Sequence, residues 1–260
     1  MAFITLTSDY GHSSHYVAAI KGLLYKQIQN VHVIDITHTI TPHDVLQTAY
    51  ILKHASPNFP ENTIHIISID TSYAKYHQFL IVKYKKQFFI GADNGLFSLL
   101  FDEPPENIFA INSDLINPDD LFPDKNLFVN IAAKIIDGED LNLFSSKTLI
   151  RNIKQNISPV VEENLIRGCI IFIDGYGNAI TNISKELFES KNFEKSRFAI
   201  FYRRKDKITY ISKNYSDVKN GAELALFNES EQLEIAMNNG TAGQLLGLKN
   251  GGQIIIEFYD

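Results

Sequence analysis

Strand-like and helix-like segments alternate through the first part of the chain. Residues 3–7, 31–37 and 63–69 are short β-rich runs, while residues 15–30 and 44–54 place apolar side chains at roughly helical spacing. Strands that alternate with helices in this way form βαβ units, whose strands lie parallel in one sheet. The alternation therefore predicts an α/β domain with a mostly parallel sheet.

The pattern changes at about residue 160. Before that point, residues 79–84 and 87–90 look like a hairpin. From residue 168, short strands separated by turn residues dominate, and only residues 242–246 look helical. Several short strands at near-regular spacing favour a small β-barrel or a sandwich. We predict an α/β domain over residues 1–160 and a smaller C-terminal β-barrel domain over residues 161–260.

Composition narrows the classes of function. The chain of 260 residues carries a net charge of −6 and has no long basic run, whereas binding to nucleic acid needs a concentrated cationic surface. No apolar stretch reaches the about 18 residues of a membrane span, and the first residues lack a charged lead-in. The single cysteine, Cys169, cannot form an internal disulfide. We therefore expect a cytoplasmic protein without nucleic-acid or membrane partners.

The eight histidines all lie between His12 and His77. His12 and His15 have a spacing that metal ligands use, but no acidic or third ligand follows at a fixed offset. The chain also has no His-Glu-x-x-His segment and no pair of cysteines. We expect no metal site, and we interpret these residues as polar histidines scattered on loops and helix faces.

Two aspartates directly follow predicted parallel strands, at the sheet edge where ligands of α/β proteins bind. They are Asp9, after the first strand, and Asp70, after the third, with the Asp93-Asn94-Gly95 turn close in sequence. Either aspartate could simply stabilise a turn. A carboxylate at a strand end can also hold the paired hydroxyls of a ribose. Because the chain has no Gly-x-Gly-x-x-Gly segment and no phosphate loop, a nucleoside without a phosphate chain fits best.

Seven segments then occur in an order typical of one enzyme family. They are Thr7-Ser8-Asp9-Tyr10-Gly11, Lys21-Gly22, Val33-Ile34-Asp35-Ile36-Thr37-His38, Thr41-Pro42-His43-Asp44, Ala92-Asp93-Asn94-Gly95, Asp174-Gly175-Tyr176-Gly177-Asn178-Ala179-Ile180-Thr181-Asn182-Ile183 and Leu233-Glu234-Ile235-Ala236. Together they resemble the S-adenosylmethionine (SAM) hydroxide adenosyltransferases, a family that includes the SAM-dependent fluorinase and chlorinase. The resemblance runs over nearly the whole chain and is thin between about residues 110 and 160.

The resemblance implies an α/β domain joined to a β-barrel, in a homotrimer whose pocket lies at the interface between subunits. It also implies substitution at the 5′ carbon of adenosine, with SAM as a substrate and no cofactor. Water or a halide attacks that carbon while methionine leaves. A sulfonium departs as a neutral thioether, so the enzyme must mainly align the reactants and strip water from the nucleophile.

The N-terminal site residues follow from the family pattern. The resemblance assigns Asp9 to the ribose hydroxyls, and Ser14 falls on a second ribose-side position that the family fills with aspartate. His43 falls where the halogenases place a tryptophan near the ligand. Asn94 lies in the turn that matches the family's Asp-Asn-Gly.

The C-terminal site residues come from two segments. The resemblance assigns Asp174 and Asn178 to contacts with the methionine portion and the adenine, and Tyr176 to aromatic packing on the ligand. Glu229, with Ser230 beside it, falls on the serine that helps to grip methionine. The alternative for residues 174–182 is a plain hairpin with Asp-Gly and Tyr-Gly-Asn turn chemistry.

The chain departs from the family where the hydrolytic branch holds the attacking water with an Asp, Arg and His set. Asp70 keeps the first position, the arginine position falls on His77 or Gln78, and the histidine position falls on Pro123. We predict a SAM hydrolase in which Asp70 and His77 form a reduced water-holding pair. The alternatives are a non-catalytic SAM- or adenosine-binding protein, an enzyme acting on a related adenosine compound and, less favoured because Asp70 would repel a halide, a halogenase.

Overall fold

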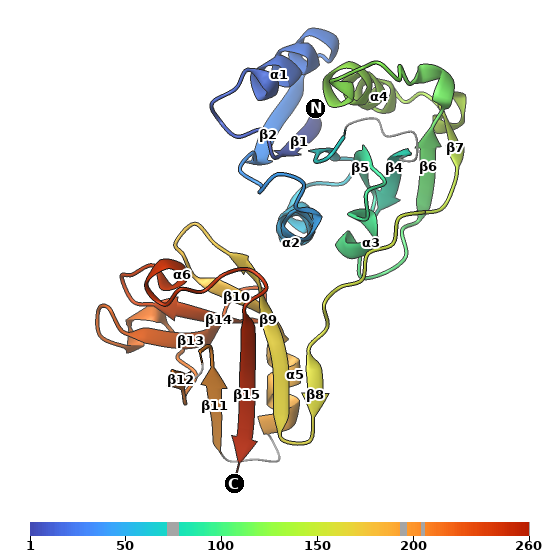
Figure 1. The fold of residues 1–260 in the computed structure, drawn as a ribbon. Helices are drawn as coiled ribbons and strands as arrows, with labels where there is room; N and C mark the ends of the chain where they lie inside the picture. Colours follow the sequence, from blue (N-terminus) through green and yellow to red (C-terminus); the bar gives the residue numbers. More distant parts are fainter. Residues whose placement is uncertain (72–77, 193–196, 204–205, 260) are drawn as a thin grey trace. The chain divides into compact units, whose positions relative to one another are not determined.

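The computed structural model describes residues 1–71, 78–192, 197–203 and 206–259. The chain divides into two compact units, Met1–Gln155 and Asn156–Asp260. Each unit has its own sheet and its own hydrophobic core (Figure 1). An α/β unit followed by a β-rich unit is the two-part organisation that the sequence predicts.

The first unit is built on one seven-stranded sheet in the order β2-β1-β3-β5-β4-β6-β7. Its strands are β1 (Ala2–Ser8), β2 (Val31–Thr37), β3 (Ile64–Ser68), β4 (Phe79–Tyr84), β5 (Gln87–Ala92), β6 (Asn107–Ile111) and β7 (Ser145–Lys147). Strands β2, β1, β3 and β5 run parallel to one another, whereas β4 pairs antiparallel with β5 and with β6, and β6 pairs antiparallel with β7.

The prediction of a mostly parallel sheet is therefore correct only for the half that contains β1, β2 and β3. The physical reason for the other half is the turn between β4 and β5. Lys85 and Lys86 have φ angles of 46° and 61°, the left-handed values of a two-residue type I′ hairpin turn. Such a turn reverses the chain immediately, so the two strands can pair only antiparallel.

Helices cover both faces of this sheet. Helices α1 (Tyr16–Gln27) and α4 (Val129–Ile136) pack on one core cluster, and α2 (Val45–Ala55) and α3 (Phe97–Leu100) pack on another (Figure 1). A π-helical turn, Asp124–Phe128, leads into α4. Short 3₁₀ turns span Ser56–Asn58, Ser113–Leu115 and Leu141–Leu143. Helices thus pack on both faces, and the strand ends are the part of such a sheet where ligands of α/β proteins bind.

The second unit is an antiparallel sheet in the order β12-β11-β15-β9-β10-β14-β13, with β8 paired to β9. Its strands are β8 (Val160–Glu162), β9 (Leu165–Ile173), β10 (Ala179–Ser184), β11 (Arg197–Phe201), β12 (Lys207–Ile208), β13 (Glu223–Phe227), β14 (Gln232–Met237) and β15 (Gln253–Tyr259), and a 3₁₀ turn spans Tyr215–Asp217. The backbone N–H of Ser212, just after β12, donates to the carbonyl of Ala225 in β13 at 2.8 Å. The sheet thus curls into a nearly closed barrel around residues such as Ile166, Ile235 and Ile256.

Among its described residues, this unit contains two helices, α5 (Lys185–Asn192) and α6 (Ala242–Leu245). The prediction that only residues 242–246 are helical in this half is wrong, because α5 is missing from it. Ser184 begins α5, since its hydroxyl accepts a hydrogen bond from the backbone N–H of Leu187 at 3.2 Å. Phe188 is the buried anchor of this short helix. No helix among the described residues is long and apolar enough to cross a membrane.

Candidate active site

Three predicted site residues meet at the carboxyl ends of the parallel strands. Asp9 follows β1, Asp70 follows β3, and His43 lies in the loop after β2. The Asp9 carboxylate oxygen Oδ2 accepts a hydrogen bond from the backbone N–H of His43 at 3.0 Å, and Nδ1 of His43 lies 3.4 Å from Oδ1 of Asp70. Three loops that are distant in sequence thus bring two carboxylates and an imidazole together.

The backbone of this cluster adopts an uncommon conformation. His43 and Asp70 have φ angles of 64° and 47°, left-handed values that few residues other than glycine adopt. Such residues concentrate at functional sites. The His43 side chain is 71% exposed and that of Asp70 is 34% exposed, so a ligand can reach both. Carboxylates at this position can accept hydrogen bonds from a sugar diol and attract a sulfonium cation.

His77, the predicted partner of Asp70, lies outside the described residues, as do residues 72–76. The Asp70–His77 pair therefore stays a prediction from the sequence. Gln78, the other residue that falls on the family's arginine position, has its amide oxygen 3.4 Å from the hydroxyl of Thr148.

Ser14 and Asn94 support the two aspartate loops. The Ser14 hydroxyl donates to the carbonyl of Tyr10 at 3.3 Å, within the loop that carries Asp9. The side-chain N–H of Asn94 donates to the carbonyl of Ile69 at 2.9 Å, directly before Asp70. Its amide oxygen accepts from the backbone N–H of Leu96 at 3.2 Å. The buried Asn94 side chain therefore organises the protein's own backbone beside Asp70.

Asp124 is a site-edge residue that sequence reasoning missed. Its carboxylate is fully buried, accepts a hydrogen bond from the Tyr10 hydroxyl, and accepts another from the Thr71 hydroxyl at 3.0 Å. Burial raises the pKa of Asp124, and burial together with the neighbouring Asp124 charge raises that of Tyr10. Since Tyr10 adjoins Asp9 and Thr71 adjoins Asp70, this one carboxylate ties the two aspartate loops together. The sequence signal for Asp124 was its place just before the apolar run 127–129.

In the second unit, residues 174–178 form the loop of the β9–β10 hairpin. Oδ1 of Asp174 accepts hydrogen bonds from the backbone N–H groups of Tyr176 and Asn178 at 2.9 and 2.8 Å. The side-chain N–H of Asn178 donates to Oδ2 of Asp174 at 3.2 Å. The backbone of these residues is therefore the plain hairpin that the sequence offered as the alternative. Tyr176 in its loop is 81% exposed.

Glu229 and Ser230 lie in the loop between β13 and β14. The backbone N–H of Ser230 donates to Oδ1 of Asn228 at 3.0 Å. The Asn228 amide N–H donates in turn to Glu234 at 3.3 Å, and the Tyr215 hydroxyl donates to the same carboxylate at 2.8 Å. Sequence reasoning missed Glu234, which is buried in β14.

Burial raises the pKa of Glu234, and the charge of Asp174 raises it further. The charge of Asp174 thus acts on the carboxylate that accepts the hydrogen bond from Asn228.

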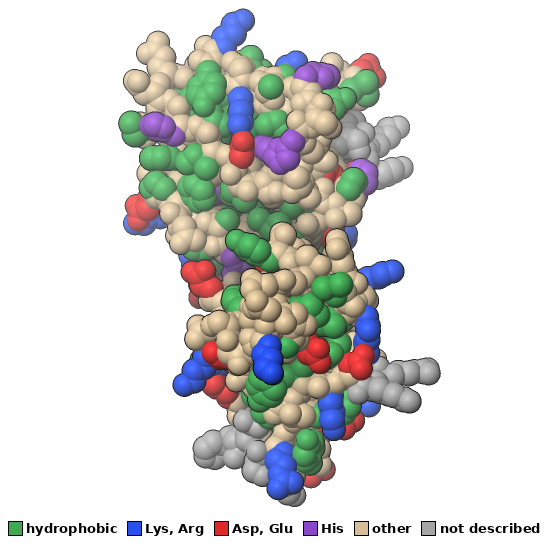
Figure 2. Space-filling view, turned by 90° about the vertical axis from the view of Figure 1, so that its left-hand side faces the viewer, with side chains coloured by type: hydrophobic (Ala, Val, Ile, Leu, Met, Phe, Trp, Pro, Cys, Tyr) green, Lys and Arg blue, Asp and Glu red, His purple; other side chains and the backbone are tan. Residues whose placement is uncertain are grey.

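The described residues contain no cluster of three or more His, Cys, Asp or Glu side chains that could hold a metal ion. On the face of Met1–Gln155 seen in Figure 2, the purple histidine side chains lie apart from one another.

Comparison with known proteins decides which family this arrangement represents. The model of the SAM hydroxide adenosyltransferase N-terminal domain matches residues 4–145, and that of the C-terminal domain matches residues 168–255. The chain belongs to the SAM hydroxide adenosyltransferase family. The family resemblance inferred from seven short segments is thereby confirmed, and each family domain falls within one structural unit.

Relatives of this adenosyltransferase-family chain are similar over nearly their full length. The (R)-S-adenosyl-L-methionine hydrolase of Methanocaldococcus jannaschii is 29% identical, over 94% of this chain and 92% of the relative. The protein of the same name from Thermus thermophilus is 24% identical, over 94% and 95%. A solved structure of an uncharacterized conserved protein from Thermotoga maritima superposes with a TM-score of 0.86 at 28% identity, covering 98% of this chain and 99% of that one.

Proposed function

We propose that this protein hydrolyses SAM to adenosine and L-methionine. Water attacks the 5′ carbon, the bond from that carbon to the sulfonium sulfur breaks, and the sulfur keeps the electron pair as a neutral thioether. The attacking water gives up one proton. The match of both family domains, together with relatives named (R)-SAM hydrolases over more than nine-tenths of their length, carries this proposal. By the same names, we propose the (R) sulfonium epimer as substrate.

We assign roles within the cluster at the carboxyl ends of the strands. Asp9 holds the ribose hydroxyls, and Asp70 orients the attacking water, with His77 as the predicted base. The contact between His43 and Asp70 supports a place for His43 at the ligand. In the second unit, Tyr176 packs on the ligand, while Asp174, Asn178, Glu229 and Ser230 shape the methionine end.

One observation favours a second candidate function, a non-catalytic SAM- or adenosine-binding protein. Pro123 stands at the family's histidine position and has no side-chain hydrogen-bond donor. The adjacent Asp124 carboxylate already accepts hydrogen bonds from the hydroxyls of Tyr10 and Thr71. Such a protein would keep Asp9 and the nucleoside site without the water-holding set.

Incubation of the purified protein with each sulfonium epimer of SAM, followed by chromatography, separates the candidates. Adenosine and methionine in equal amounts from the (R) epimer support the hydrolase. Binding of adenosine or SAM without turnover would instead select the binding protein, and a halogenated adenosine formed in the presence of chloride or fluoride would select a halogenase.

We also propose a homotrimer with the ligand pocket at the subunit interface, and a cytoplasmic location. The trimer rests on the family resemblance, and the location rests on composition and on the single cysteine. Sedimentation at micromolar concentration tests the assembly, and a mass of one or two 29.5 kDa chains would overturn the trimer.

A further inference from the structure

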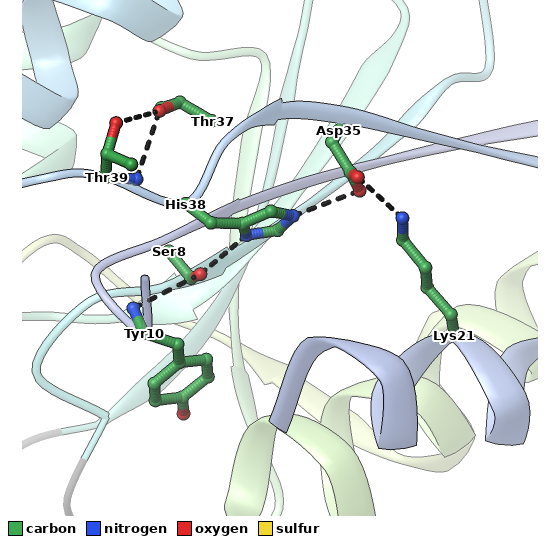
Figure 3. Close-up of polar contacts among 7 residues, drawn as sticks. All are labelled: Ser8, Tyr10, Lys21, Asp35, Thr37, His38 and Thr39. Atoms are coloured by element: carbon green, nitrogen blue, oxygen red, sulfur yellow. Dashed lines mark hydrogen bonds and ion pairs between the residues drawn. The ribbon is translucent and has the colours of Figure 1, made fainter. Parts of the chain in front are cut away.

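The segment Val33–His38 belongs to the family pattern, yet none of its residues takes part in the proposed chemistry. His38, directly after β2, is buried at 2% exposure. Its Nδ1 lies 2.7 Å from the Ser8 hydroxyl, and its Nε2 lies 3.0 Å from Oδ1 of Asp35. The other oxygen of Asp35 lies 2.5 Å from the ammonium of Lys21 (Figure 3). A continuous polar relay thus leads from an α1 surface lysine to the end of β1.

The Asp35 carboxylate beside Nε2 favours one tautomer of the His38 ring. Because a carboxylate can only accept, it favours the ring hydrogen on Nε2, and in that tautomer Nδ1 is an acceptor. The Ser8 hydroxyl then donates to Nδ1. The Ser8 oxygen remains able to accept, and the backbone N–H of Tyr10 lies 3.5 Å from it.

His38 also contacts the far end of the same turn. The backbone N–H of Gly11 donates to the His38 carbonyl at 2.7 Å. The ring of His38 therefore holds Ser8 while its carbonyl holds Gly11, and Asp9 lies between these two anchored residues. With both ends fixed, the turn has little freedom to redirect the Asp9 carboxylate.

A serine, a histidine and an aspartate in one chain of polar contacts are also the residue set of nucleophilic catalysis. Here the Ser8 side chain is 2% exposed, and its oxygen already lies between the His38 ring and the Tyr10 N–H. This burial suits a residue that positions the turn and does not suit a nucleophile that must meet a substrate.

We propose that His38 is a positioning residue that acts through Ser8 to aim Asp9 at the ribose hydroxyls of the substrate. The proposal rests on the proposed function, because it takes Asp9 as the ribose-binding group. Wild-type turnover is therefore measured first. A wild type that neither turns over SAM nor binds adenosine would overturn both the proposed function and the positioning role.

Two substitutions of His38 separate its hydrogen bond to Ser8 from its contact with Asp35. His38→Gln places its amide near the Nε2 position, so it can reach Asp35 but leaves the Ser8 hydroxyl without an acceptor. His38→Asn places its amide near the Nδ1 position and keeps an acceptor for Ser8. We expect His38→Gln to raise the KM for SAM about tenfold with a small change in kcat, because ribose contacts are made in ground and transition states alike. We expect His38→Asn to restore KM to within about threefold of wild type.

Two further variants complete the test. Ser8→Ala should raise KM as His38→Gln does, and the double variant should raise it no further, because both remove one interaction. His32→Gln, the same change at the exposed amino end of β2, is the matched control and should leave KM unchanged. Thermal melts check folding, and if His38→Gln does not fold, Ser8→Ala decides. If the wild type turns over SAM and the folded Ser8→Ala and His38→Gln variants keep the wild-type KM, the positioning role of His38 is overturned. The proposed function is not affected by that result.

Discussion

The predicted site residues differ in whether their side chains are exposed or are buried and hydrogen-bonded within the protein. His43, Asp70 and Tyr176 expose a third or more of their side chains. Asn94 and Asn178 are buried, and their amides hydrogen-bond within the protein. Substitutions in the first group should change ligand binding with little loss of stability, whereas substitutions in the second should lower both.

Asp9→Ala should weaken the binding of adenosine. A charge-assisted hydrogen bond contributes about 1.5–3 kcal/mol, so the loss of even one corresponds to a tenfold or greater rise in Kd. Calorimetric titration with adenosine measures the change, and Asp9→Asn is the matched control, because it keeps the shape and some hydrogen bonding. Unchanged affinity in Asp9→Ala would remove this residue from the site.

Two histidines compete for the role of base beside Asp70. If Asp70 and His77 hold the water, His77→Ala should lower kcat roughly 10²-fold, while His43→Ala should act mainly on KM, because the backbone N–H that holds Asp9 remains. A base must be neutral, so wild-type kcat should fall as acid protonates the imidazole. A large loss of kcat in His43→Ala, with His77→Ala unaffected, would transfer the role to His43.

Asp124 should leave a signature in the pH dependence of stability. Burial raises its folded pKa above the unfolded value, so its contribution to stability is greatest below the unfolded pKa and is lost as pH rises through the folded pKa. Relative to Asp124→Asn, the free energy of unfolding of the wild type should therefore decrease as pH rises from about 4, the unfolded pKa of an aspartate, through the raised folded pKa. Urea denaturation across that range measures the difference, and an opposite slope would contradict the assignment.

At the scale of secondary-structure elements, the hairpin β4–β5 shows both what the sequence could predict and where it misled. The strand-like runs on either side of Lys85 and Lys86 predict the hairpin, but the alternation of strands and helices before it does not indicate the antiparallel half of the sheet that the hairpin begins. Helix α5 was not predicted, because its two turns are too short to display a helical period of apolar residues. Its first residues follow a serine cap that resembles an ordinary turn.

Lys85→Gly should stabilise the hairpin. Lys85 has a φ angle of 46°, which costs a residue with a side chain more than it costs glycine. We expect the free energy of unfolding to rise by about 0.5–1 kcal/mol, measured by urea denaturation. The matched substitution Lys83→Gly, within strand β4, should destabilise, and a loss of stability in Lys85→Gly would contradict the turn assignment.

The candidate site also contains some residues that the sequence predicts and others that it does not. Asp9 and Asp70 were predictable, because each directly follows a strand and neighbouring parallel strands bring their carboxyl ends together. The buried partners Asp124 and Glu234 were not. Tyr10 and Asp124 are 114 positions apart, and no local pattern reports a contact of that separation. Glu234 lay inside a quoted family segment without an assigned role, because its partner Tyr215 lies in a different loop.

At the scale of the whole molecule, the two units share the predicted site residues. Met1–Gln155 carries Asp9, His43 and Asp70, and Asn156–Asp260 carries the Asp174 loop and Tyr176. Each unit matches its own family domain, and relatives retain both over nearly their full length. We therefore expect the proposed activity to need both units and to be absent from either unit alone.

The central claim is that water attacks the 5′ carbon of SAM on this chain. Turnover of the (R) epimer in water enriched in oxygen-18, with mass spectrometry of both products, tests it most directly. We predict adenosine that carries one heavy oxygen in its 5′ hydroxyl, formed together with unlabelled methionine. No adenosine, or adenosine formed without the label, would contradict the account.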